Sequence, residues 1–204
     1  MKALKPFLPL LIFTFLILIL VTMSCSNDDN KANQVAYNEE NPLTAYMALS
    51  GFYQKTSVTK NAPVFSESGF SFKPTVAGKI NAFIVNIPDV NPALRVTLWD
   101  VSTKTILKSE TINVPTENVS VEKTITPIAL TKDKEYFISI NSGDWFVREK
   151  KEGIATVSYP IAAGNIIITG FAHVSSKAPE YVFPNSFSDN FYAGDATFKF
   201  QQTE

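Results

Sequence analysis

The stretch Leu94-Arg95-Val96-Thr97-Leu98-Trp99 decides the fold class, because it alternates aliphatic residues with residues of a second kind. In an extended chain successive side chains point to opposite faces of the sheet, so the three aliphatic residues fall on one face. The others, Arg95, Thr97 and Trp99, share the second face. This is the pattern of a half-buried antiparallel strand, with one face on a core and the other open.

Similar short runs, rich in β-branched and aromatic residues, recur from residue 42 to the C-terminus between turns of Pro, Gly, Asn and Asp. Ile166 to Ile168 form a continuous apolar run, which predicts a central strand or one covered on both sides. Only residues 43–49 suggest a helical period. The sequence therefore predicts an all-β domain over residues 42–204, a single antiparallel β-sandwich of jelly-roll-like or immunoglobulin-like type. The expected strands are 70–73, 79–87, 94–101, 106–114, 119–125, 135–141, 145–149, 165–174 and 196–201.

The N-terminus has the three parts of a secretory signal. Lys2 and Lys5 precede an apolar run over residues 7–21, and the small residue Ser24 stands before Cys25. This layout resembles the signal of bacterial lipoproteins, which implies that residues 1–24 are removed and that Cys25 carries the lipid anchor. An uncleaved membrane anchor and ordinary cleavage are the alternatives. The anchor is disfavoured because the apolar run is shorter than the ~20 residues that a spanning helix needs.

Residues 25–41 are polar and nearly free of aliphatic side chains, so we expect a short disordered tether between lipid and domain. Asp28 and Asp29 resemble the acidic surface-export signal of Bacteroidota lipoproteins. The expected location is therefore the outer membrane, through the N-terminal lipid, with the cell surface slightly favoured over the periplasm.

Six motifs of the domain resemble a bacterial extracellular module of unknown function. These are Gly69 to Pro74, Gly78 to Ile80, Val96 to Asp100, Pro127 to Tyr136, Phe183 to Ser186 and Asn190 to Tyr192, and the resemblance extends from about Ser68 onward. That module is β-sandwich-like and occurs beside carbohydrate-active and adhesive domains. The resemblance implies an exported, non-catalytic domain and supplies no active site to transfer.

Cysteine content and charge restrict the function further. Cys25 is the only cysteine, so the chain has no internal disulfide and, once lipidated, no free thiol. Removing Lys2 and Lys5 from 18 basic residues leaves 16 against 19 acidic ones, a formal charge of −3. Nucleic acid is an unsuitable partner, because its binders concentrate Lys and Arg in a strongly positive patch.

Catalytic chemistry has little support in the sequence. His173 is the only histidine and follows an apolar run without a neighbouring nucleophile motif, so we expect a strand residue at the sheet edge and no enzyme. Zinc lacks ligands. We expect no cofactor, although a structural calcium ion would suit the oxygen atoms of Asp189, Asn190 and Asp195.

Aromatic residues beside Asp and Asn are the best ligand-binding candidates. An exposed ring can stack on the apolar face of a sugar while polar groups fix its orientation. The candidates are Trp99, Trp145, Tyr181, Asp189, Asn190 and Tyr192, and the aromatic loop 179–194 is expected to fold back over the sandwich end. The alternative for each ring is packing beneath a loop. The sequence thus favours an anchored envelope protein that binds a glycan or another surface component, ahead of docking on a partner protein and of a glycoside-active enzyme.

Overall fold

The computed structural model describes residues 36–50, 52–59, 65–150, 159–176, 180–188 and 195–204. Cys25, the expected signal segment and most of the expected tether lie outside these residues. The chain divides into two compact units, and the second, residues 37–204, contains the β-domain. Within the described residues, no helix is long and apolar enough to span a membrane.

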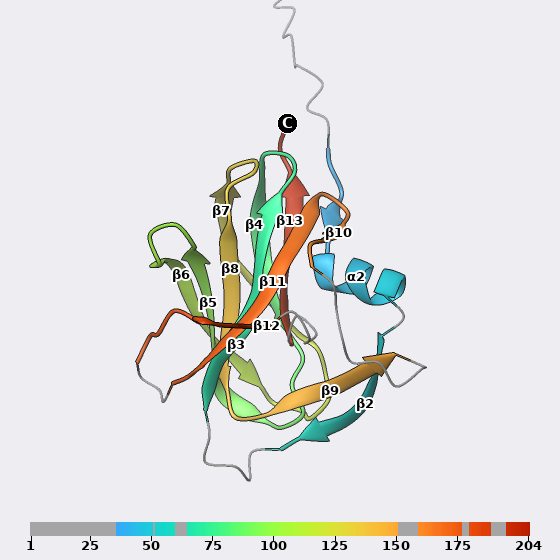
Figure 1. Ribbon diagram of the computed structural model, residues 1–204, viewed down its shortest axis with the longest axis vertical. Helices are drawn as coiled ribbons and strands as arrows, with labels where there is room; N and C mark the ends of the chain where they lie inside the picture. Colours follow the sequence, from blue (N-terminus) through green and yellow to red (C-terminus); the bar gives the residue numbers. More distant parts are fainter. Residues whose placement is uncertain (1–35, 51, 60–64, 151–158, 177–179, 189–194) are drawn as a thin grey trace, which may run out of the picture. The chain divides into compact units, whose positions relative to one another are not determined.

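Two large antiparallel sheets and one small ribbon make up the β-domain (Figure 1). The four-stranded sheet has the order β1-β13-β4-β7, and the seven-stranded sheet has the order β10-β11-β3-β8-β5-β6, with β12 also paired to β11. Strands β2 and β9 form the ribbon. The strands are β1 (Glu39–Glu40), β2 (Phe52–Val58), β3 (Ser66–Pro74), β4 (Gly78–Val85), β5 (Asn91–Asp100), β6 (Thr105–Val114), β7 (Val121–Leu130), β8 (Tyr136–Ser142), β9 (Trp145–Lys150), β10 (Ile161–Ala163), β11 (Ile166–Ser175), β12 (Ser186–Ser188) and β13 (Ala196–Gln202).

Aromatic rings from both large sheets fill the core. Phe72 of β3 lies 4.5 Å from Phe198 of β13, and Phe70 lies 6.2 Å from the same ring, measured between centroids. All three side chains are fully buried, and each contributes about 1.5–3 kcal/mol by leaving water. The predicted all-β sandwich is confirmed.

Helix α2 (Pro42–Ser50) contains residues 43–49, where the sequence suggests a helical period. Asn41 caps it, because its Oδ1 accepts hydrogen bonds from the amides of Leu43 and Thr44 at 3.1 and 3.2 Å. Pro42 follows at the first helical position, where its fixed φ and missing N–H suit the helix start. On the buried side Tyr46 packs against Phe52, so the helix is fixed to the start of the ribbon.

Four strands were not expected from the sequence: β1, β2, β10 and β12. Strand β1 pairs with β13, so the sheet begins before the expected domain boundary at residue 42. Glu40 also accepts a hydrogen bond from the amide of Asn165 at 2.8 Å, in the tight turn between β10 and β11. Gly164 supplies the positive φ of 66° that this turn requires. The chain is therefore joined to the sandwich from Tyr37 onward, where the Tyr37 carbonyl accepts from Gln201.

Strand β5 corrects the expectation of one open face. Leu94, Val96 and Leu98 lie in the core as predicted, but Thr97 and Trp99 on the second face are also buried, with exposures of 0% and 3%. The neighbouring β8 is buried at every residue. The second face of the large sheet is therefore covered as well.

The cover is the segment of residues 180–188, called the covering segment below, which ends in β12. Strand β12 pairs with β11 through Phe187 opposite Ala172 (Figure 1). Phe183 packs its ring edge-on against Trp99, with centroids 5.7 Å apart and planes at 86°, and also contacts Phe137. Phe183 thus joins Trp99 and Phe137 in a second, smaller apolar cluster outside the main core.

Candidate functional site

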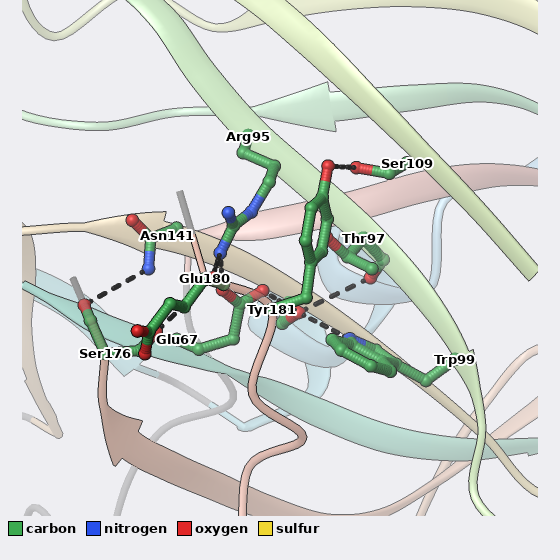
Figure 2. Close-up of polar contacts among 10 residues, drawn as sticks. Glu67, Arg95, Thr97, Trp99, Ser109, Asn141, Ser176, Glu180 and Tyr181 are labelled. Carbon is green, nitrogen blue, oxygen red and sulfur yellow. Dashed lines mark hydrogen bonds and ion pairs between the residues drawn. The ribbon is translucent and has the colours of Figure 1, made fainter. Parts of the chain in front are cut away.

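A buried carboxylate lies beneath the covering segment (Figure 2). Glu67 of β3 has no exposed surface, and its Oε1 accepts a hydrogen bond from Ser139 Oγ at 2.6 Å. Ser139 in turn accepts from the indole Nε1 of Trp99 at 2.9 Å. This chain of contacts joins the three adjacent strands β3, β8 and β5, and it satisfies the polar atom of the buried indole.

Arg95 of β5 links this buried chain to the covering segment. Its Nη2 atom donates to Glu67 Oε2 and to the backbone carbonyl oxygen of Glu180, both at 2.6 Å. The guanidinium lies 4.1 Å from the centre of the Tyr181 ring, and Tyr181 Oη is 3.2 Å from Ser109 Oγ (Figure 2). A cation over an aromatic face is attracted by the ring quadrupole. Arg95 therefore holds the covering segment on the sheet.

This arrangement changes the interpretation of two predicted ligand-binding residues. Trp99 was expected on an open face, but its ring lies under Phe183 with its N–H already bonded, so a ligand would have to displace the cover to reach it. Tyr181 is 48% exposed, yet one of its faces is occupied by Arg95. These contacts give both side chains a role in fixing the covering segment.

The third predicted ligand-binding residue, Trp145, lies on the ribbon and is not covered by the covering segment. Trp145 of β9 is 43% exposed, and so is Tyr53 of β2. The register places Trp145 opposite Val58 and Tyr53 opposite Glu149, and residues 145 and 149 share a face of β9. Both rings therefore project from one face of the ribbon, while Phe146 on the other face is buried.

Tyr53 was missed because β2 does not look like a strand in the sequence. Its residues Gln54 to Ser57 are polar, and the register shifts between Gln54 and Thr56, which interrupts the period-2 pattern. The available signals were the aromatic residues Phe52 and Tyr53 and the β-branched residues Thr56 and Val58.

Asp195, one of the expected calcium ligands, is buried at the start of β13. Its carboxylate pairs with the Arg148 guanidinium of β9, and Oδ2 accepts from the amide of Phe146 at 2.9 Å. Burial raises the pKa of Asp195, and the Arg148 charge and the Phe146 amide act in the opposite direction. Both carboxylate oxygens are thus engaged in tying the ribbon to the four-stranded sheet.

The remaining predicted residues Asp189, Asn190 and Tyr192 lie outside the described residues. Among the residues that the structure does describe, no three His, Cys, Asp or Glu side chains are grouped as metal ligands would be. His173 lies on β11 opposite Ser186 of β12, and its ring stacks on Phe171 with centroids 6.0 Å apart. Its Nδ1 has no hydrogen-bond partner within this part of the chain.

No model of a known protein family matches the chain, and a comparison with curated proteins found no match. The resemblance to the bacterial extracellular module stays a prediction, and any functional argument must come from the geometry. One surface that the described residues offer to a large ligand is the face of the ribbon with two exposed rings, which we call the ribbon face: Tyr53, Thr56, Val58, Trp145 and Val147.

Proposed function

We propose that this protein is a lipid-anchored envelope protein whose β-sandwich binds a glycan on the ribbon face, without catalysis. The observation that carries the proposal is the pair of exposed rings, Tyr53 and Trp145, on one face of one ribbon. The anchoring part of the proposal rests on the signal-like leader and on Cys25 in the sequence.

Exposed aromatic rings favour a sugar ligand for a physical reason. A tryptophan or tyrosine ring carries a large apolar surface that gains free energy when it is covered, and its edge retains a polar group that stays hydrated. Pyranose rings have an apolar C–H face that can cover such a ring, while their hydroxyl groups remain in water. A ligand of this kind can bind an open surface without being enclosed.

The spacing of the two rings favours an extended oligosaccharide over a single sugar. Trp145 and the residue opposite Tyr53 are four positions apart on β9, roughly 13 Å, since a strand rises about 3.3 Å per residue. Between the two rings, the paired residues Val147 and Thr56 have shorter side chains, so the surface there is lower than the rings. A glycan chain lying along the ribbon can therefore cover both rings.

The proposal is tested by screening the full chain, in detergent micelles, on a glycan array. We expect binding by the native protein, loss of binding in Trp145→Ala and at least tenfold weakening in Tyr53→Ala. Phe187→Ala is the matched control, because Phe187 is 64% exposed but lies on β12, away from the ribbon pairing. An array on which the native protein binds nothing would overturn the proposal.

Docking on a partner protein is the second candidate, and one observation favours it. Strand β6 is an edge of the seven-stranded sheet, and its adjacent residues Ile106 and Leu107 are each 41% exposed. Further along, Lys123 of β7 contacts the carbonyl of Thr111 at 2.9 Å and pairs with Glu110, which protects that part of the edge. Crosslinking in cells that captures one stoichiometric partner, and loses it in Ile106→Lys with Leu107→Lys, would support docking. Unchanged capture by that double variant would contradict it.

A further inference from the structure

A pocket of about 320 Å³ lies where helix α2, the end of β4, the inner face of the ribbon and the start of β13 meet. Its volume is at the lower end of the range for small-molecule sites, so it suits one ring rather than a chain. Arg148 lines it from β9, and Trp145 stands three residues earlier on that strand. Alternation places these two side chains on opposite faces of the ribbon, so the pocket is separate from the ribbon face.

One polar atom at the pocket has no hydrogen-bond partner among the described residues. Asn86 lines the pocket, and its Oδ1 is buried without a hydrogen bond in the described part of the chain. The residue is held in place because its amide donates to the Asp195 carbonyl at 2.9 Å. An unsatisfied buried acceptor destabilises the fold, and a ligand hydroxyl group that reached it would remove this cost.

The charge of the lining disfavours an ionic ligand. Arg148 and Asp195 are the charged residues among those that line the pocket in the described structure, and they form an ion pair with each other. Their side chains are only 8% and 2% exposed. An anion would have to compete with Asp195 for the guanidinium, and a cation would have to compete with Arg148, so a neutral ligand fits best.

The lining mixes apolar and polar side chains. Leu43 and Met47 of α2 and Ile84 of β4 supply apolar surface, whereas Thr44, Ser120 and Asn86 supply hydrogen-bonding groups. A ligand that matches this mixture needs both hydroxyl groups and C–H surface. We propose that the pocket binds a single neutral polyhydroxylated ring, that is, one sugar unit, at a site independent of the ribbon face.

The test is a titration of the full chain, isotopically labelled and in detergent micelles, followed by NMR. The probes are glucose, galactose, mannose and N-acetylglucosamine on the order of 10 mM, at which weak binding with a Kd near 1 mM is saturated. We expect at least one sugar, and neither sodium acetate nor glycerol, to shift the amide signals of Asn86, Ser120 and Thr197. No shift with any of the four sugars, or an equal shift with acetate, would overturn the proposal.

Two variants of helix α2 decide whether the amide shifts come from sugar bound in the pocket. Thr44 is exposed on α2 and lines the pocket, so Thr44→Trp should fill it from outside and abolish the shifts without disturbing the core. Ala48→Trp is the matched control, because Ala48 is exposed on the same helix and does not line the pocket. Trp145→Ala should retain the shifts, since the two sites are independent. Shifts that persist in Thr44→Trp, or that disappear in Trp145→Ala, would contradict the inference.

Discussion

Glu67 is the residue on which the covered face of the large sheet depends. It is a fully buried carboxylate, and its partners Arg95 and Ser139 come from two other strands. A buried charge is tolerated when it is paired and hydrogen-bonded, and removing one partner is costly because the other charge stays behind without compensation. Glu67 thus contributes to the stability of this face through partners on two neighbouring strands.

We predict that Glu67→Gln lowers the free energy of unfolding by about 3 kcal/mol, because Arg95 loses its anionic partner beneath the covering segment. Glu122→Gln is the matched control. Its carboxylate pairs with Lys199 at 2.8 Å but is 42% exposed, so its loss should cost less than about 1 kcal/mol. Urea titrations measure both values. Equal effects of the two substitutions would show that Glu67 has no special role.

Asp100 makes the stability of the fold depend on pH in the acidic range. Hydrogen bonds from Lys134 and Ser102 to its carboxylate hold the pKa well below the ordinary value of 3.8. The unfolded chain therefore takes up a proton before the folded one does. The stabilisation is complete above about pH 4 and is lost as the pH falls toward the lowered pKa of the folded state.

Asp100→Asn should accordingly flatten the fall of stability below about pH 4, because the group that binds the extra proton on unfolding is gone. Lys134→Met should flatten it too, since it removes the first cause of the lowered pKa. Urea titrations at a series of acidic pH values measure the slope. Slopes identical to that of the native protein in both variants would contradict this assignment.

At the scale of elements, the close approach of β3 and β8 depends on glycine. A Cβ atom at Gly69 of β3 would collide with the backbone carbonyl of Ile138 on β8. The carbonyl belongs to a buried strand with neighbours on both sides, so it cannot move aside. Glycine is therefore required at this position in the register that pairs the two strands.

Gly69→Ala is predicted to prevent folding or to lower the free energy of unfolding by more than about 4 kcal/mol, because β3 and β8 must separate. Gly170→Ala on the adjacent β11 is the control. A Cβ there would meet only Ser71 Oγ, at 3.5 Å, an ordinary van der Waals contact. Soluble yield and thermal unfolding compare the two, and a stable Gly69→Ala protein would rule out the proposed strand packing.

The elements that were predicted from sequence are those in which apolar and β-branched residues form a local pattern. Strands β3 to β9, β11 and β13 all overlap expected ranges, because an alternation or, in β11, a continuous apolar run is visible in the sequence. Strands β1, β10 and β12 have only two or three residues, too short for a period to appear. The burial of Trp99 also escaped prediction, because the residue that covers it, Phe183, is distant in sequence and no local pattern reports such a contact.

At the scale of the whole molecule, the proposed anchor and the proposed binding surface rest on different kinds of observation. The anchor rests on sequence alone, whereas the ribbon face rests on the pairing of β2 with β9, which was not expected. Of the candidate ligand-binding residues, the sequence identified Trp145 and missed Tyr53. An exposed pair of rings becomes recognisable only when the register is known.

Cys25→Ser is predicted to abolish lipid attachment, because serine lacks the thiol that carries the lipid, while the apolar run over residues 7–21 can still hold an uncleaved chain in the membrane. The intact mass measures the effect: the native protein should contain the lipid and the variant should not. Ser24→Ala keeps a small residue before the cysteine and serves as the control. A native protein whose mass contains no lipid, or a Cys25→Ser protein that still carries it, would contradict lipidation at this residue.

The most direct test of glycan binding on the ribbon face is collisional quenching of tryptophan fluorescence by acrylamide, in the native protein, with and without an array-positive glycan. The chain has two tryptophans, of which Trp145 is 43% exposed and Trp99 only 3% exposed, so the quenchable emission without ligand belongs to Trp145. If a glycan stacks on the ribbon face, saturating ligand should protect that emission and leave the emission of Trp99 unchanged. A glycan that binds while Trp145 remains fully quenchable would contradict the account.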